Sequence, residues 1–75
     1  MITAQVLLNN IEKVNCFVEK MSEKNYDIDL SLGKYLVNGK SMIGVLSLDL
    51  TKPVTVIAET NDESFLHEID EYIAK

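Results

Sequence analysis

The chain has 75 residues, and 12 acidic against 7 basic side chains give a formal net charge of −5 at neutral pH. A domain of this size buries only about 60% of the surface of its unfolded chain, which allows one thin core and excludes a deep, enclosed active site. All the basic residues are Lys, so the chain lacks the Arg side chains that bind phosphates in a bidentate manner, and a nucleic-acid partner is not expected.

Cysteine content and hydropathy indicate the cellular location. The lone Cys16 cannot form an internal disulfide, and no Cys/His cluster has zinc-ligand spacing, so packing must hold the fold in a reducing compartment. The N-terminus lacks the basic start and long apolar run of a signal peptide, and no run of ~18 apolar residues occurs. We therefore expect a cytoplasmic protein with no membrane association, no metal and no other cofactor.

The N-terminal third predicts a strand followed by a helix. Ile2–Leu8 is a short apolar run without helical spacing, and Asn9-Asn10 after it suit a helix cap. The helix is expected to end near Glu23. Its apolar residues recur three to four positions apart and mark one buried face: Ile11, Val14, Phe17, Val18 and Met21. Cys16 is expected to be a small buried or half-buried residue of the same helix.

The middle third predicts a hairpin and an ambiguous segment. Polar and apolar residues alternate from Tyr26 to Leu32, as in a strand with one solvated face, and a glycine turn leads into a second short strand, Tyr35–Val37. The apolar residues of Ser41–Leu50 fit both a helix and a strand template. Asn38-Gly39 would make a hairpin turn before a strand, whereas Ser41 would be a good N-cap for a helix.

The last third predicts a strand and a helix. Val54–Glu59 is β-branched and follows Pro53, which suits the first position of a strand. Asn61–Ser64 opens a helix with an acidic first turn. The apolar residues of this helix are expected on one face: Phe65, Leu66, Ile69, Tyr72 and Ile73. The order β-α-β-β-(α or β)-β-α predicts one α+β domain over residues 1–75, with a layer of helices on an antiparallel sheet.

A motif in the middle of the chain carries a family resemblance. Lys40–Leu48, KSMIGVLSL, resembles the K-S-I-M-G-V-M-S-L segment of the HPr family, the histidine-containing phosphocarriers of the bacterial sugar phosphotransferase system. Asp27–Leu30 and Val37-Asn38 fall where the family has its second strand and the V-N after its turn. Downstream, Pro53–Glu59 resembles the family's E-I-T-I-x-A-D strand, and Asp62–Ser64 resembles its D-E-S helix start.

The resemblance extends from Tyr26 to the C-terminus and covers the first third of the chain only in outline. It implies the family's open-faced β-sandwich, in which three helices cover one face of a four-stranded antiparallel sheet. It also implies that Ser41 opens a short middle helix, so the helix is preferred over the strand for Ser41–Leu48.

The family's phosphocarrier motif is degenerate in this chain. The family transfers phosphate through a His in a G-I-H-A-R-P-A motif, with an Arg that assists. A gapless alignment places Asn10 at the His position, Glu12 at the Arg position and Lys13 at the Pro position, and the loop is about four residues shorter. An amide cannot carry a phosphoryl group, and Glu12 would repel one. We expect a non-enzymatic HPr-like protein that binds other proteins, either phosphotransferase-system components or regulators.

The resemblance implies two further roles for the middle helix. Ser41 matches the family's regulatory Ser, which an ATP-dependent kinase modifies in many Gram-positive bacteria; the alternative is a simple N-cap worth ~1 kcal/mol. Met42, Ile43 and Leu46 match an apolar patch that docks partner proteins; the alternative is that they pack in the core. If two of the three are exposed together, a protein partner is the better explanation. Glu12 would reverse a charge at the rim of that patch, so we expect altered partners.

Two other functions remain open. The chain could be a working phosphocarrier with a different acceptor, and His67 is its only imidazole. It could also be a regulator that acts through phosphorylated Ser41. His67 has Glu63 and Glu71 four residues to either side, but any charged helix produces this spacing, so we expect an exposed His and no metal site.

Overall fold

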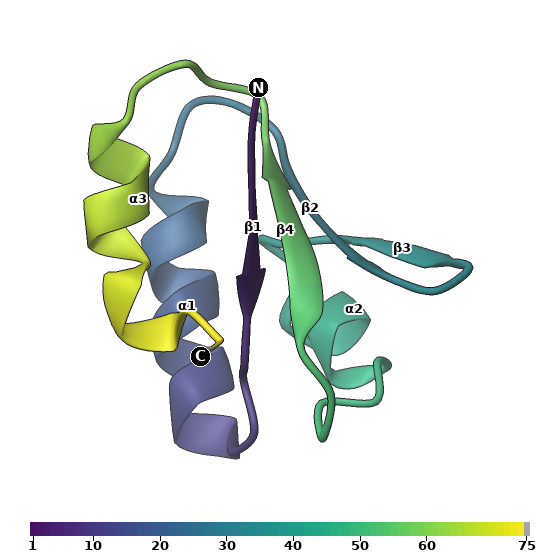
Figure 1. Ribbon diagram of the computed structural model, residues 1–75. Coiled ribbons are helices and arrows are strands. Elements are labelled where there is room, and N and C mark those ends of the chain that lie inside the picture. Colours follow the sequence, from purple (N-terminus) through teal and green to yellow (C-terminus); the bar gives the residue numbers. More distant parts are fainter. Residues whose placement is uncertain (75) are drawn as a thin grey trace.

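The computed structural model describes residues 1–74 and has the element order β-α-β-β-α-β-α. The elements are β1 (Ile2–Val6), α1 (Ile11–Ser22), β2 (Ile28–Leu32), β3 (Tyr35–Asn38), α2 (Met42–Leu46), β4 (Val54–Ala58), α3 (Ser64–Glu68) and the 3-10 turn η1 (Asp70–Tyr72). The expected α+β fold is confirmed: the strands form one open antiparallel sheet in the order β1-β4-β2-β3 (Figure 1). No helix in residues 1–74 is long and apolar enough to span a membrane.

The sheet has one buried and one open face. Val56 in β4 lies opposite Ala4 of β1 on one side and opposite Leu30 of β2 on the other. Because successive side chains of a strand point to opposite faces, these residues share the face that the helices cover. Their neighbours in sequence, such as Thr3 and Asp29, belong to the open face.

One apolar core lies between the sheet and the helices. Phe17 of α1 meets Tyr72 edge to face with ring centroids 5.5 Å apart, and Phe65 of α3 meets Tyr26 at 6.2 Å. Edge-to-face contacts of this kind add stability beyond the burial of the rings. The other buried side chains are aliphatic: Val6, Leu8, Val14, Val18, Met21, Ile28, Leu30, Val45, Leu48, Val54, Val56, Ala58 and Ile69.

The predicted strands and the first helix are confirmed, with ends that shift by one or two residues. β1 ends at Val6 rather than Leu8, and β2 begins at Ile28 rather than Tyr26. The ambiguous middle segment is helical as the resemblance implied, since α2 occupies Met42–Leu46. α1 ends at Ser22, and the backbone N–H of Glu23 still bonds to the last turn.

The last helix is shorter than predicted. α3 ends at Glu68, and the backbone leaves helical geometry at Ile69, with φ −102° and ψ 6°. After η1, Ile73 forms an antiparallel bridge with Val6 of β1, so a continuous helical face to Ile73 was wrong. The acidic first turn was also wrong: the acidic residues precede the helix, and Asp62 Oδ1 accepts a hydrogen bond from the Ser64 N–H at 3.0 Å.

Two residues of α1 lie outside its expected buried face. Ile11 is 62% exposed because it is the first residue of the helix, and burial begins one turn later at Val14. Cys16, expected to be buried or half-buried, is an exposed free thiol. It lies beside the apolar stripe and not within it, so its side chain does not contribute to the core.

Candidate functional site

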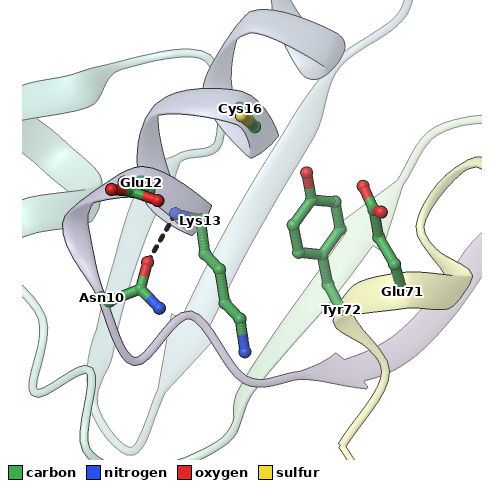
Figure 2. Close-up of a pocket in the computed structure, with 6 residues that line it drawn as sticks. All are labelled: Asn10, Glu12, Lys13, Cys16, Glu71 and Tyr72. Atoms are coloured by element: carbon green, nitrogen blue, oxygen red, sulfur yellow. Dashed lines mark hydrogen bonds between the residues drawn. The ribbon is translucent and has the colours of Figure 1, made fainter.

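A hollow of about 300 Å³ lies at the start of α1, where the resemblance placed the degenerate carrier motif (Figure 2). The first turns of α1 form one wall, and the C-terminal turn forms the other. Its lining residues are Asn10, Glu12, Lys13, Cys16, Glu71 and Tyr72. The expected pair Asn10 and Glu12 is therefore brought together with residues from the far end of the chain.

Asn10 caps α1. Its backbone is extended, with φ −150° and ψ 162°, and its Oδ1 accepts a hydrogen bond from the Lys13 N–H at 2.8 Å. Its carbonyl oxygen also accepts from the Val14 N–H at 3.2 Å. The side-chain bond satisfies the Lys13 N–H, which the first helical turn leaves free, and the carbonyl accepts the first bond of the helix itself, as expected for a cap. The predicted cap is confirmed, and the side-chain oxygen of Asn10 is already engaged.

Tyr72 forms the buried wall of the hollow. The residue is only 4% exposed, and Figure 2 shows its hydroxyl beside the Glu71 carboxylate. Burial and the neighbouring Glu71 raise the pKa of Tyr72 to about 12. The Lys20 ammonium lies 3.0 Å from Glu71 Oε1 and 5.5 Å from the centre of the Tyr72 ring, and it holds the pKa of Glu71 below its usual value.

The charges around the hollow do not favour an anion. Glu12 and Glu71 contribute two carboxylates, whereas Lys13 is the single cation among the lining residues. The Lys13 Nζ already donates to Asn9 Oδ1 at 3.2 Å. Because Glu71 is paired with Lys20, the lining carries one further carboxylate, Glu12, and one ammonium that is already engaged. It therefore offers a phosphoryl group no free cation, and none of these side chains is an imidazole that could accept one.

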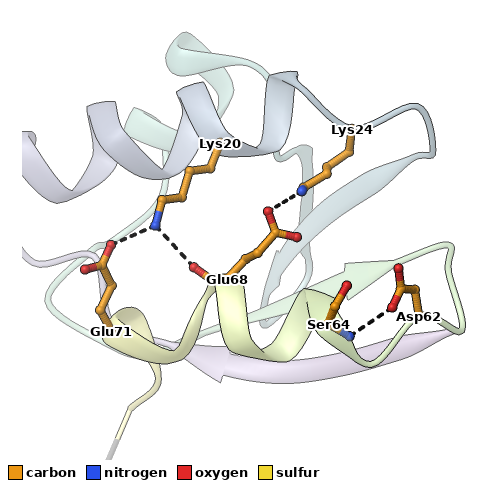
Figure 3. Close-up of polar contacts among 6 residues, drawn as sticks. All are labelled: Lys20, Lys24, Asp62, Ser64, Glu68 and Glu71. Carbon is orange, nitrogen blue, oxygen red and sulfur yellow. Dashed lines mark hydrogen bonds and ion pairs between the residues drawn. The ribbon is translucent and has the colours of Figure 1, made fainter.

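Ionic contacts between α1 and the C-terminal elements hold this wall in place (Figure 3). Lys20 donates both to Glu71 and, at 3.3 Å, to the backbone carbonyl of Glu68. Just beyond the end of α1, Lys24 forms an ion pair with the Glu68 carboxylate, which raises the pKa of Lys24. Because Lys20 lies on α1 and Lys24 directly follows it, the two pairs hold the C-terminal elements, and Tyr72 with them, against this helix.

His67 lies away from the hollow, as an exposed residue of α3. Its predicted neighbours at four-residue spacing do not share a helical face with it, because Glu63 only precedes α3 and Glu71 lies beyond its end, paired with Lys20. Within residues 1–74, no group of three His, Cys, Asp or Glu side chains is placed to hold a metal ion.

Ser41 opens α2. Its Oγ accepts a hydrogen bond from the Gly44 N–H at 3.1 Å, and its carbonyl accepts from the Val45 N–H at 3.0 Å. The residue is half-buried. The N-cap predicted at Ser41 is confirmed.

The three apolar residues assigned to partner binding divide into two groups. Ile43 is 85% exposed and Leu46 is 43% exposed, so both side chains lie in solvent on the same short helix. Met42 is half-buried against the core, and Val45 is fully buried and anchors the helix. Of the three residues, only Met42 therefore fits the alternative that these side chains pack in the core. None of these residues lines the hollow at α1.

One wall of the hollow, formed by Tyr72 and Glu71, was not predicted from the sequence. Tyr72 was predicted as a core residue, which is correct, but neither it nor Glu71 was connected with Asn10. No local sequence pattern predicts that the C-terminal turn lies beside the start of α1, because this arrangement depends on the bridge between Val6 and Ile73 at opposite ends of the chain. Lys20 could have been suspected only as one of many helical surface charges.

Comparisons with known proteins add no family. No protein-family model matches this chain, and no curated protein matches it. The HPr resemblance therefore stays a prediction that depends on the motif Lys40–Leu48 and the segments around it.

Proposed function

We propose that this chain is an HPr-like, non-enzymatic module that binds another protein, a phosphotransferase-system component or a regulator, through α2. One observation carries the proposal: Ile43 and Leu46 are exposed together, at 85% and 43%. Large aliphatic side chains that share one exposed helix are a common feature of docking surfaces, because a partner removes their apolar area from water. Val45 and half-buried Met42 attach that helix to the core, which makes the pair a rigid surface.

Loss of phosphotransfer is the second part of the proposal. Asn10 at the carrier position is a neutral amide whose oxygen caps α1. Glu12 gives the rim of the adjoining hollow a carboxylate that has no ion pair among the described residues, whereas Glu71 is paired with Lys20. A family partner that presents acidic groups to this rim would be repelled, so the proposed partner has a neutral or basic surface there. The exposed free thiol of Cys16 favours a cytoplasmic location, where thiols stay reduced.

Labelling tests the loss of phosphotransfer. The protein is incubated with the first enzyme of the phosphotransferase system and labelled phosphoenolpyruvate, and no acid-labile phosphohistidine is expected. Label on the wild type that disappears in His67→Gln would overturn this part of the proposal and favour a working carrier.

Variants of α2 test protein binding. Three immobilised proteins are compared for what each retains from a cell extract. They are the wild type, the double variant Ile43→Lys with Leu46→Lys, and the single variant Leu66→Lys. Leu66 is a matched control, because it is 39% exposed on a different helix. A protein retained by the wild type and by Leu66→Lys, but lost with the α2 double variant, supports the proposal. Equal retention by all three rejects α2 as the binding surface.

A regulator that acts through phosphorylated Ser41 is the second candidate, favoured by the geometry of this cap. The Ser41 Oγ lies 3.1 Å from the Gly44 N–H at the start of α2, so phosphate oxygens on it would remain near hydrogen-bond donors of the first turn. Mass spectrometry after incubation with ATP and the serine kinase of the family would detect the modification. Absence of phosphate on Ser41, with a known substrate modified in parallel, rules this candidate out.

A further inference from the structure

The two edges of the sheet differ in how the chain covers them. At β1, the bridge between Val6 and Ile73 is flanked by two backbone bonds, from the Leu7 N–H to the Tyr72 carbonyl at 2.7 Å and from the Ala74 N–H to the Gln5 carbonyl at 2.9 Å. At the other edge, β3 pairs with β2 alone, and Figure 1 shows this hairpin projecting from the body.

The outward groups of β3 can be assigned from the register. The Gly39 N–H donates to the Ile28 carbonyl of the neighbouring β2 chain at 2.8 Å, so alternate residues back along β3 also face β2. Leu36 and Asn38 therefore direct their backbone groups away from the sheet. The Asn38 carbonyl accepts from the Ser41 N–H at 3.1 Å, but no bond from residues 1–74 reaches the outward groups of Leu36.

Apart from its short length of four residues, this edge lacks the usual protection against strand addition. Natural edge strands carry charges, prolines or bulges that block pairing with another chain. β3 reads YLVN, without a charge or a proline, and its pairing with β2 is regular over its whole length. Tyr35 is 70% exposed and Leu36 is 63% exposed, on opposite faces of the strand. The edge thus offers free backbone groups together with apolar side chains.

A second hollow, of about 510 Å³, adjoins the start of β3. It lies between the β2–β3 turn and the segment that follows α2, and its lining includes Leu32, Tyr35 and Leu48. Tyr35 lies opposite Leu32 in the register, so both are on the helix-covered side of the sheet, beyond the region that α2 covers. A strand added along β3 would direct alternate side chains toward this hollow.

The hollow is locally basic on an acidic protein. Lys34 and Lys52 both line it, and Asp49 is its one carboxylate. Asp49 is already engaged: it accepts from the Thr51 hydroxyl at 2.6 Å and lies 3.9 Å from the Lys52 ammonium. Lys34 forms no ion pair within the part of the chain that the structure describes. Carboxylates of an incoming segment would therefore find a free ammonium here, although the whole chain carries −5.

We propose that the outer edge of β3 and this second hollow together bind an extended, acidic peptide segment of another protein. The segment adds a fifth strand through the outward groups of Leu36 and Asn38, places an apolar side chain against Tyr35, and sets carboxylates beside Lys34 and Lys52. This surface is separate from the pair Ile43 and Leu46 on α2.

A second copy of the chain fits the edge less well. Two copies would each contribute a charge of −5. In the antiparallel register that sets Leu36 against Asn38 of the other copy, Lys34 would lie opposite Lys40 of that copy. Like charges directly opposite one another destabilise a strand pair. An acidic heterologous segment is therefore the occupant that the charges favour.

Peptide titration tests the proposal. The probe is a blocked synthetic peptide, EVEVFVEVE, in which glutamates and one central phenylalanine share a face, and the control is its lysine counterpart, KVKVFVKVK. Both are titrated into the 15N-labelled full chain. The acidic peptide is expected to shift the amide signals of β3, to slow hydrogen exchange at the Leu36 N–H, and to bind at least tenfold more tightly than the basic control.

Two variants separate strand addition from general charge attraction. Leu36→Pro removes an outward N–H that the sheet does not use, and edge strands tolerate proline at such positions. This variant is expected to bind the acidic peptide at least tenfold more weakly. The control Leu36→Ala keeps the N–H and is expected to bind the peptide without such a loss. The double variant Lys34→Glu with Lys52→Glu should bind the basic peptide more tightly than the acidic one. This test does not require a proline in the strand. Ile43→Lys with Leu46→Lys should leave peptide binding unchanged, which separates this surface from the proposed function.

Several outcomes would overturn the proposal. They are the absence of shifts in β3 at millimolar peptide, equal affinity for the two peptides, or wild-type affinity in the folded Leu36→Pro variant. Sedimentation showing that the free chain dimerises through β3, with the dimer lost in Leu36→Pro, would assign the edge to a second copy instead.

Discussion

The buried Tyr72 hydroxyl predicts a specific loss of stability at alkaline pH. Its pKa is raised from 10.0 to about 12 by burial and by Glu71. A group with a raised folded pKa favours the protonated folded state, so its contribution is complete below pH 10 and is lost as the pH rises through 12. Since one pKa unit corresponds to about 1.4 kcal/mol, ionisation of Tyr72 should reduce the free energy of unfolding by about 2 to 3 kcal/mol across this window.

Urea unfolding of the wild type and of Tyr72→Phe, followed by circular dichroism between pH 8 and pH 12, measures this effect. The Phe ring can keep the edge-to-face contact with Phe17 and has no proton to lose. The difference in stability between the two proteins should therefore shift in favour of Tyr72→Phe by about 2 to 3 kcal/mol above pH 10. Tyr35→Phe is the control, because Tyr35 is 70% exposed. Parallel curves for the wild type and Tyr72→Phe would refute the assigned burial and charge environment.

Three further substitutions test local features by urea unfolding at neutral pH. Asn10→Ala should lower the free energy of unfolding by about 1 kcal/mol through loss of the α1 cap, whereas Asn15→Ala, on the exposed side of the same helix, should not. Gly33→Ala should cost about 1 kcal/mol, because this turn residue has φ +60°. Gly39→Ala should cost about 1 to 3 kcal/mol, because its Cβ would lie 3.1 Å from the Ile28 carbonyl oxygen, which the sheet holds in place. Stability unchanged in any of these variants would contradict the corresponding contact.

Elements with a strong local pattern were predictable from the sequence. The apolar stripe from Val14 to Met21 and the cap at Asn10 defined α1, and alternation defined the β2–β3 hairpin. The middle segment did not have such a pattern. Five residues of helix between two turns are too short to show a period, so the assignment of α2 required the resemblance at Lys40–Leu48.

The C-terminal turn was not predictable because its structure depends on distant partners. Phe65, Ile69 and Tyr72 recur at helical spacing and are all buried, so the apolar pattern is satisfied by a helix and by the observed path alike. Hydrogen bonds from the edge of β1 decide between them, since Leu7 and Gln5 bond to the segment around Ile73. Helix propensity is a weak preference that such tertiary contacts override.

The same limit explains what was predictable of the candidate site. Asn10 and Glu12 follow from the motif alignment, and their chemistry can be read from residue type alone. The wall formed by Tyr72 and Glu71 exists only because the chain leaves helical geometry at Ile69 and returns to β1. The raised pKa of Tyr72 therefore depends on a contact between the two ends of the chain and not on any local pattern.

The C-terminal turn has a consequence for the opposite side of the sheet. The Tyr72 carbonyl and the Ala74 N–H occupy outward groups of Leu7 and Gln5, so the free part of the β1 edge is shortened to the start of that strand. At the other edge, the outward groups of Leu36 stay free, beside Lys34 and Lys52. A long last helix would leave the whole β1 edge open to a competing strand. The short α3 therefore favours strand addition at β3, where charge can select an acidic segment.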